Sequence, residues 1–76
     1  MDDKNRVYWA CKRGMLELDL ILIPFFENHY NNLSIHEKRI FSRLLTATDP
    51  ELFTWLLGRE GPPQEMVEII EKIIKR

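Results

Sequence analysis

The chain has 76 residues, the length of one domain, and 45% of them are hydrophobic, so it is apolar enough to fold. A chain this short buries only about 60% of the surface that its unfolded form exposes, which leaves little room for a substrate pocket beside the core and disfavours an enzyme. Eleven Lys and Arg against twelve Asp and Glu, spread evenly over both halves, give a formal net charge of −1. Neither a basic surplus nor a basic stripe is evident, so we expect no nucleic-acid partner.

The cysteine content and the apolar runs bear on the compartment. The single Cys11 cannot form an internal disulfide, which excludes a small disulfide-stapled secreted fold. The sequence MDDKNR at the start has neither signal-peptide nor transit-peptide character. The longest apolar run, 20–26, is far short of the roughly 20 residues that cross a bilayer. We therefore expect a soluble cytoplasmic protein without direct membrane insertion.

The first predicted helix begins at a cap, Asp2 or Asp3, and ends at Gly14. The second runs from about Met15 to Tyr30. Its middle, LILIPFF, is apolar on every side, which predicts burial on several faces and a central position in the fold. Pro24 removes a backbone hydrogen bond and should bend this helix. The inward face of the first helix carries Val7, Ala10 and Cys11.

Capping signals start the remaining helices. Ser34 and Glu37 form a capping box for the third helix. The fourth begins either at an Asp49 cap or at a Thr48/Glu51 capping box, and the sequence leaves both open. A Gly-Pro-Pro turn precedes the fifth helix. Without any alternation of period two, the pattern predicts an all-α fold: a single domain over residues 1–76 built as a small five-helix bundle.

Candidate sites for chemistry are weak. His29, His36 and Cys11 have no metal-ligand spacing, and Cys11 falls on the inward face, where a cysteine acts as a small hydrophobe. Glu17 and Asp19 are two residues apart on a helix and point in different directions, so they are no acid–base pair. No Gly-rich phosphate loop is present. We expect no catalytic residue, no metal ligand and no cofactor-binding residue.

One basic face needs a separate interpretation. The third helix carries Lys38, Arg39 and Arg43 on its outer side, as some DNA-binding helices do. Three cations on an otherwise neutral domain are more often a solvated face, so a DNA-binding bundle stays a minor alternative.

The sequence RGMLE, 13–17, forms a sharp corner between the first two helices. A purely local explanation has Gly14 in a left-handed turn, Glu17 complementing the helix dipole and Arg13 paired with Glu17. However, Arg6 and Arg13 are seven residues apart, on one stripe of the first helix, with Trp9 near the line between them. Arginine and tryptophan are enriched at protein interfaces. From the residues alone, a structural and a partner-binding corner remain equally supported.

The corner resembles a known family. RGMLE is similar to the RGxxE signature of the succinate dehydrogenase FAD assembly factors, also called flavinators. WACKRGMLELDLILIPFFENHY resembles the first two helices of that family, and DPELFTWLLG resembles its second recurrent block. Five residues alone would be a weak match, but the two blocks at this spacing cover most of a short chain.

The resemblance implies a small α bundle that binds the flavoprotein subunit of succinate dehydrogenase, and in bacteria that of fumarate reductase. Such a factor promotes covalent attachment of FAD to a client histidine, so that the flavin and the chemistry belong to the client. By position, the signature assigns partner binding to Arg13, Gly14 and Glu17, with Met15 inside the motif. Arg6 and Trp9 are added to the predicted partner-binding residues because they are neighbours on the same stripe of the first helix. The missing transit peptide favours the bacterial branch, and we expect a monomer when free.

Family members have also been described as antitoxin components of toxin–antitoxin pairs. A regulatory protein that binds a toxin is therefore the alternative function. The two functions differ in which surface matters: the corner for assembly, and another surface, such as that of Arg39 and Arg43, for a toxin.

Overall fold

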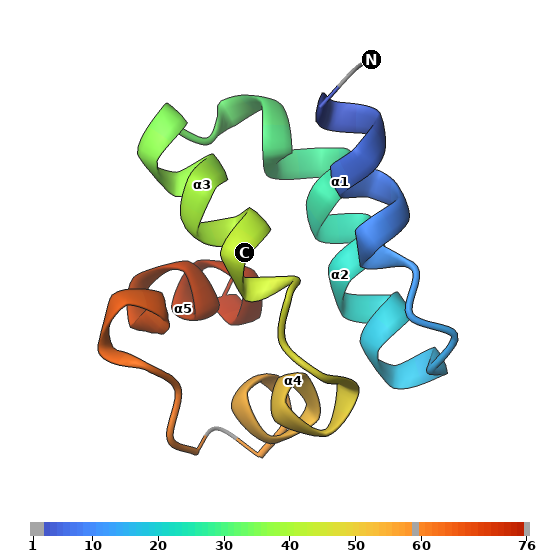
Figure 1. The fold of residues 1–76 in the computed structure, drawn as a ribbon, viewed down its shortest axis with the longest axis vertical. Helices are drawn as coiled ribbons and strands as arrows, with labels where there is room; N and C mark the ends of the chain where they lie inside the picture. Colours follow the sequence, from blue (N-terminus) through green and yellow to red (C-terminus); the bar gives the residue numbers. More distant parts are fainter. Residues whose placement is uncertain (1–2, 59, 76) are drawn as a thin grey trace.

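The computed structural model describes residues 3–58 and 60–75 and folds them into five α-helices without strands, as the sequence predicts (Figure 1). Single turns of 3₁₀ helix follow α2 and precede α5. The predicted cap at Asp2 lies outside the described residues. The elements in chain order are α1 (Asp3–Cys11), α2 (Leu16–His29), η1 (Tyr30–Asn32), α3 (Ile35–Leu44), α4 (Asp49–Leu56), η2 (Gln64–Met66) and α5 (Val67–Lys75).

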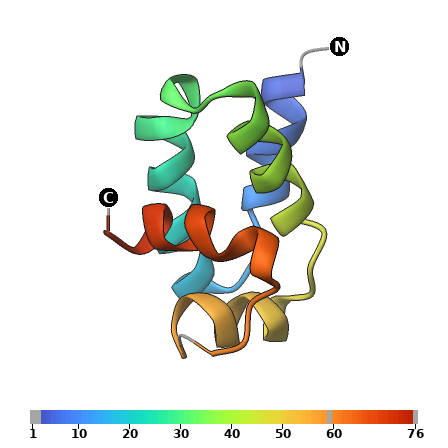
Figure 2. The same cartoon turned by 90° about the vertical axis from the view of Figure 1, so that its left-hand side faces the viewer.

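Helix α2 is the centre of the packing, because α1, α4 and α5 all contact it (Figures 1 and 2). Helix α3 packs on α5 and on the turn before it. The core joins one face of each helix, as the apolar spacing predicts. Its fully buried side chains are Cys11, Leu18, Leu22, Phe25, Phe41, Leu44, Leu52 and Ile73.

The prediction that LILIPFF is buried on several faces is wrong in part. Leu22, Phe25 and Phe26 are buried, but the side chain of Leu20 is 61% exposed. Because α1, α4 and α5 cover α2 without enclosing it, part of the helix surface faces solvent. Pro24 lies inside α2, which continues through it to His29.

Local capping chemistry sets the starts of α3 and α4. Both bonds of the Ser34/Glu37 capping box are present. At α4 the Thr48/Glu51 box forms and Asp49 is the first helical residue, which decides between the two predicted starts. Asp49 is therefore available for another partner. Helix α1 ends at Cys11, earlier than the predicted end at Gly14.

An ion pair joins α3 to α5. The ammonium group of Lys72 bonds the carboxylate of Glu37, the same residue that closes the capping box of α3. Hydrogen bonds from Lys72 and from the backbone of Ser34 lower the pKa of Glu37. Within the described residues no helix is both long and apolar enough to cross a membrane.

Candidate partner-binding corner

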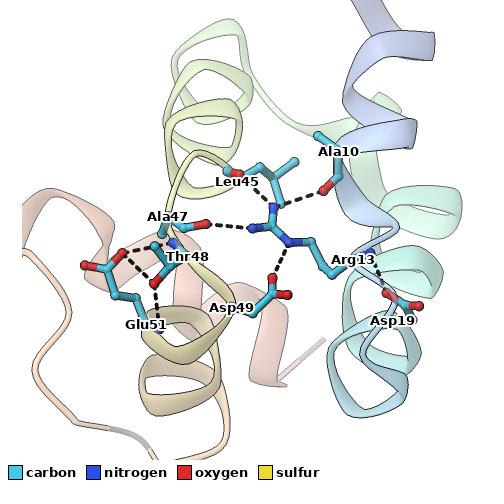
Figure 3. Close-up of polar contacts among 8 residues, drawn as sticks. All are labelled: Ala10, Arg13, Asp19, Leu45, Ala47, Thr48, Asp49 and Glu51. Atoms are coloured by element: carbon cyan, nitrogen blue, oxygen red, sulfur yellow. Dashed lines mark hydrogen bonds and ion pairs between the residues drawn. The ribbon is translucent and has the colours of Figure 1, made fainter.

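The corner is organised by the side chain of Arg13, which lies in the connection between α1 and α2 (Figure 3). Its Nε donates to Oδ1 of Asp49 at 2.8 Å. Its Nη2 donates to the carbonyl oxygen of Ala47 at 2.7 Å, and Nη1 to those of Leu45 at 2.8 Å and Ala10 at 3.2 Å. The side chain is only 15% exposed. Four bonds from one guanidinium thus join α1, the α3–α4 loop and α4.

The predicted pairing of Arg13 with Glu17 is wrong. The side chain pairs with Asp49, and the backbone N–H of Arg13 donates to Oδ1 of Asp19 at 2.8 Å (Figure 3). Two carboxylates from different helices therefore fix the main chain and the side chain of one residue. Glu17, also in the first turn of α2, is left exposed.

Gly14 has the left-handed conformation that the sequence predicts, with φ of +82°. A Cβ atom added to Gly14 would meet nothing within 4 Å, so the space around it is open. Met15 follows in an extended conformation and is the N-cap of α2, without a side-chain bond to the helix. The chain thus reverses direction at an exposed glycine. The hydrogen bond from the backbone of Arg13, before the glycine, to the side chain of Asp19, after it, closes this turn.

Two exposed leucines were not singled out from the sequence, Leu16 inside the RGMLE corner and Leu20 one turn beyond it. Leu16 is 67% exposed and Leu20 61% exposed, and their spacing of four places them on one face of α2. Adjacent exposed apolar side chains of this size form a patch of the kind that marks protein interaction sites. Counting Leu16, Leu18, Leu20 and Leu22 on a helical wheel would have separated this exposed pair from the buried pair.

The predicted stripe of Arg6, Trp9 and Arg13 is wrong as a helix face, because α1 ends at Cys11 and Arg13 lies beyond it. Trp9 is 61% exposed on the side of α1 away from the core. Its ring packs edge-on against Tyr8, with centroids 5.7 Å apart, and Nζ of Lys12 lies 5.1 Å from its centre. Arg6 is exposed on the same helix.

Cys11 is fully buried beneath the corner. Burial raises its pKa from 9.0 to about 12, although the nearby Arg13 guanidinium acts in the opposite direction. A thiol with this pKa stays protonated near neutral pH and is a poor nucleophile. Among the residues that the structure describes, no group of three His, Cys, Asp or Glu side chains could hold a metal ion.

Comparison with known proteins identifies the family. A family model described as the flavinator of succinate dehydrogenase matches residues 5–76. The chain belongs to this family. Two relatives of this flavinator chain are both named FAD assembly factor SdhE. The protein of Yersinia pseudotuberculosis is 49% identical over 76 residues, and that of Pectobacterium atrosepticum 44% over 75, each match covering 93% of this chain and 85% of the relative.

A solved structure supports the fold. The solution structure of a UPF0350 protein is 40% identical to this flavinator chain, with a TM-score of 0.74 over 95% of this chain and 78% of the other. The family description is that of an assembly factor and not of an enzyme. The comparisons do not test the assignment of Arg13, Gly14, Met15, Glu17, Arg6 and Trp9 to partner binding, which stays a prediction.

Proposed function

We propose that this protein promotes covalent flavinylation of succinate dehydrogenase by binding its flavoprotein subunit through the RGMLE corner. The role in flavinylation follows from membership of the flavinator family. The corner supports the binding step, because an exposed glycine turn, a free-standing carboxylate and exposed leucines are presented by a fixed main chain. The flavoprotein subunit of fumarate reductase is the second client in this proposal.

The single observation that carries the proposal is the set of bonds around Arg13 (Figure 3). These bonds hold the corner in one conformation before any partner arrives, so little conformational entropy is lost on binding. Arg13 is then the residue that positions the docking surface, while Gly14, Met15 and Glu17 make the contact. Trp9 on α1 extends the surface in this proposal.

In the proposed mechanism the flavin, the acceptor histidine and the bond-forming chemistry belong to the client. Covalent attachment requires that histidine to be held against the flavin ring in a reactive geometry. A helper that binds this arrangement more tightly than the open form increases its population by the ratio of the two affinities. We propose that the protein acts in this way as a monomer in the cytoplasm, on the client before its assembly is complete.

Gly14→Arg tests the docking surface with a matched control. Gly61 also has a left-handed backbone, with φ of +59° and nothing within 4 Å of an added Cβ atom. Gly61→Arg therefore carries a similar backbone cost, on the order of 1 kcal/mol, at a distant loop. We expect Gly14→Arg to abolish covalent flavinylation while Gly61→Arg retains it, with both variants helical by circular dichroism.

The measurement is in-gel flavin fluorescence of the succinate dehydrogenase flavoprotein subunit, from cells with the wild-type protein, without it, or with one variant. Glu17→Ala should also reduce the covalent flavin. Equal fluorescence with and without the protein would contradict the proposed function, and a search for a toxin partner would then follow. Equal loss in both glycine variants would show that backbone strain, and not docking, explains the effect.

A further inference from the structure

A basic cleft lies between α1 and α3, which stand on either side of the end of α2 in Figure 1. Its volume is about 860 Å³. Five of its described lining residues are basic and none of them is acidic. The basic lining residues are Lys4, Arg6, Lys38, Arg39 and Arg43.

These five cations are grouped at one cleft of a chain whose formal net charge is −1. One of the five cations, Arg43, forms an ion pair with Glu65 at 2.7 Å, so the five cations and this carboxylate carry a formal charge of +4. Six Lys and Arg then remain against eleven Asp and Glu, which gives the rest of the chain a formal charge of −5. Charges of one sign lining a concave surface focus their potential there and attract the opposite charge. The cleft thus favours an anionic group that is small enough to stay within it.

The walls of the cleft are also apolar. Val7, Ala10 and Leu45 line it, and the side chain of Ile35 is 73% exposed. Arg39 is exposed and takes part in none of the ion pairs and hydrogen bonds found among the described residues. A ligand that fits these walls carries carboxylates or other anions together with at least one apolar side chain.

The cleft is joined to the corner through Arg13. The carbonyl oxygens of two lining residues, Ala10 and Leu45, both accept hydrogen bonds from the Arg13 guanidinium. The same side chain therefore supports the inner wall of the cleft and the docking corner. A single partner that reaches both surfaces would contact one continuous region of the molecule.

We propose that the cleft between α1 and α3 binds an acidic segment of the client flavoprotein subunit, in which carboxylates flank an apolar side chain. This inference rests on the proposed function and adds a second contact region to it. A nucleic acid or an anionic membrane is a poorer occupant, because either would extend past the cleft over surface with a formal charge of −5. The apolar walls also match a peptide better than a phosphate backbone.

Charge reversal of Arg39 tests the inference, with Lys75→Glu as the control. Both residues are exposed on helices and both variants change the net charge by two, but Lys75 lies outside the cleft. Binding to the recombinant flavoprotein subunit would be measured by biolayer interferometry. We expect Arg39→Glu to weaken binding about tenfold, largely through slower association, and Lys75→Glu to change it less than about twofold.

Further binding experiments identify what kind of molecule occupies the cleft. A synthetic peptide of Glu and Leu residues should compete with the client, and a peptide of Ser and Leu should not. If the wild type binds and Arg39→Glu binds equally well, the inference is overturned while the proposed function stands. If the wild-type protein does not bind the subunit, the proposed function fails and the inference fails with it. The wild-type protein would also be tested with a 20-base-pair DNA duplex (about two helical turns) and with phosphatidylserine vesicles. If it binds either of them more tightly than the client subunit, and Arg39→Glu loses this binding, the occupant of the cleft is not a protein segment.

Discussion

Arg13 lies where the carboxyl ends of two helices meet. The last carbonyl groups of a helix have no partner within it, and they carry a partial negative charge. Arg13 donates to Ala10 in the last turn of α1 and to Leu45 and Ala47 just beyond α3. One cation therefore satisfies carbonyl groups at both helix ends. Asp49 then balances the charge of a side chain that is mostly buried.

Arg13→Lys tests this role at the residue scale. Lysine keeps the charge but loses the planar fork that reaches several acceptors at once. We expect the free energy of unfolding to fall by about 1–3 kcal/mol, because one ammonium group cannot serve the three part-buried carbonyl oxygens and Asp49 together. Urea denaturation followed by circular dichroism measures it. Arg39→Lys, at an exposed position, should change it by less than about 0.5 kcal/mol. Equal stabilities would show that the bonds to Arg13 contribute little.

At the scale of elements, the start of α4 supports the corner. The hydroxyl oxygen of Thr48 accepts the backbone N–H of Glu51, and the carboxylate of Glu51 accepts the backbone N–H of Thr48. This box places Asp49 in the first turn, where its carboxylate meets Arg13 and also complements the helix dipole. A local cap thereby determines the position of a long-range ion-pair partner.

Thr48→Ala removes the cap and leaves Asp49 in place. We expect a loss of about 1 kcal/mol in the free energy of unfolding, the usual cost of losing an N-cap. Thr54→Ala is the matched control, because Thr54 is exposed in the interior of the same helix. It should leave stability unchanged or slightly higher, since alanine is the better helix former. Thermal unfolding compares the two, and a larger loss in Thr54→Ala would contradict this account of α4.

At the scale of the whole molecule, the burial of Cys11 makes the stability of the fold depend on pH in the alkaline range. Its pKa is 9.0 in the ordinary case and about 12 in the folded protein. Between these values the unfolded chain has lost the thiol proton and the folded chain retains it. The folded state binds more protons there, so stability falls as pH rises from 9 toward 12 and is independent of this group below pH 9.

Urea unfolding of the wild type and of Cys11→Ala at several pH values measures this dependence. We expect the wild type to lose stability relative to Cys11→Ala by up to about 1.4 kcal/mol per pH unit above pH 9. The other ionisable groups are common to both proteins, so their contributions cancel in the difference. A constant difference from pH 7 to pH 11 would mean that the thiol ionises equally in both states.

The local features of this protein were predictable from neighbouring residues. The Ser34/Glu37 box depends on a spacing of three residues, and the left-handed turn depends on Gly14 alone. The apolar spacing predicted the all-α fold class, although it overestimated the burial of Leu20. The RGMLE corner and the DPELFTWLLG block indicated the family that the comparisons confirm.

Only the tertiary structure decided which distant groups meet. Arg13 and Asp49 are 36 residues apart, and no local pattern predicts that pairing over one with Glu17. The basic cleft combines cations of α1 with those of α3, so a sequence with evenly spread charge conceals it. The physical reason is that caps and helical faces depend on bonds within a few residues, whereas ion pairs and clefts depend on how the helices pack.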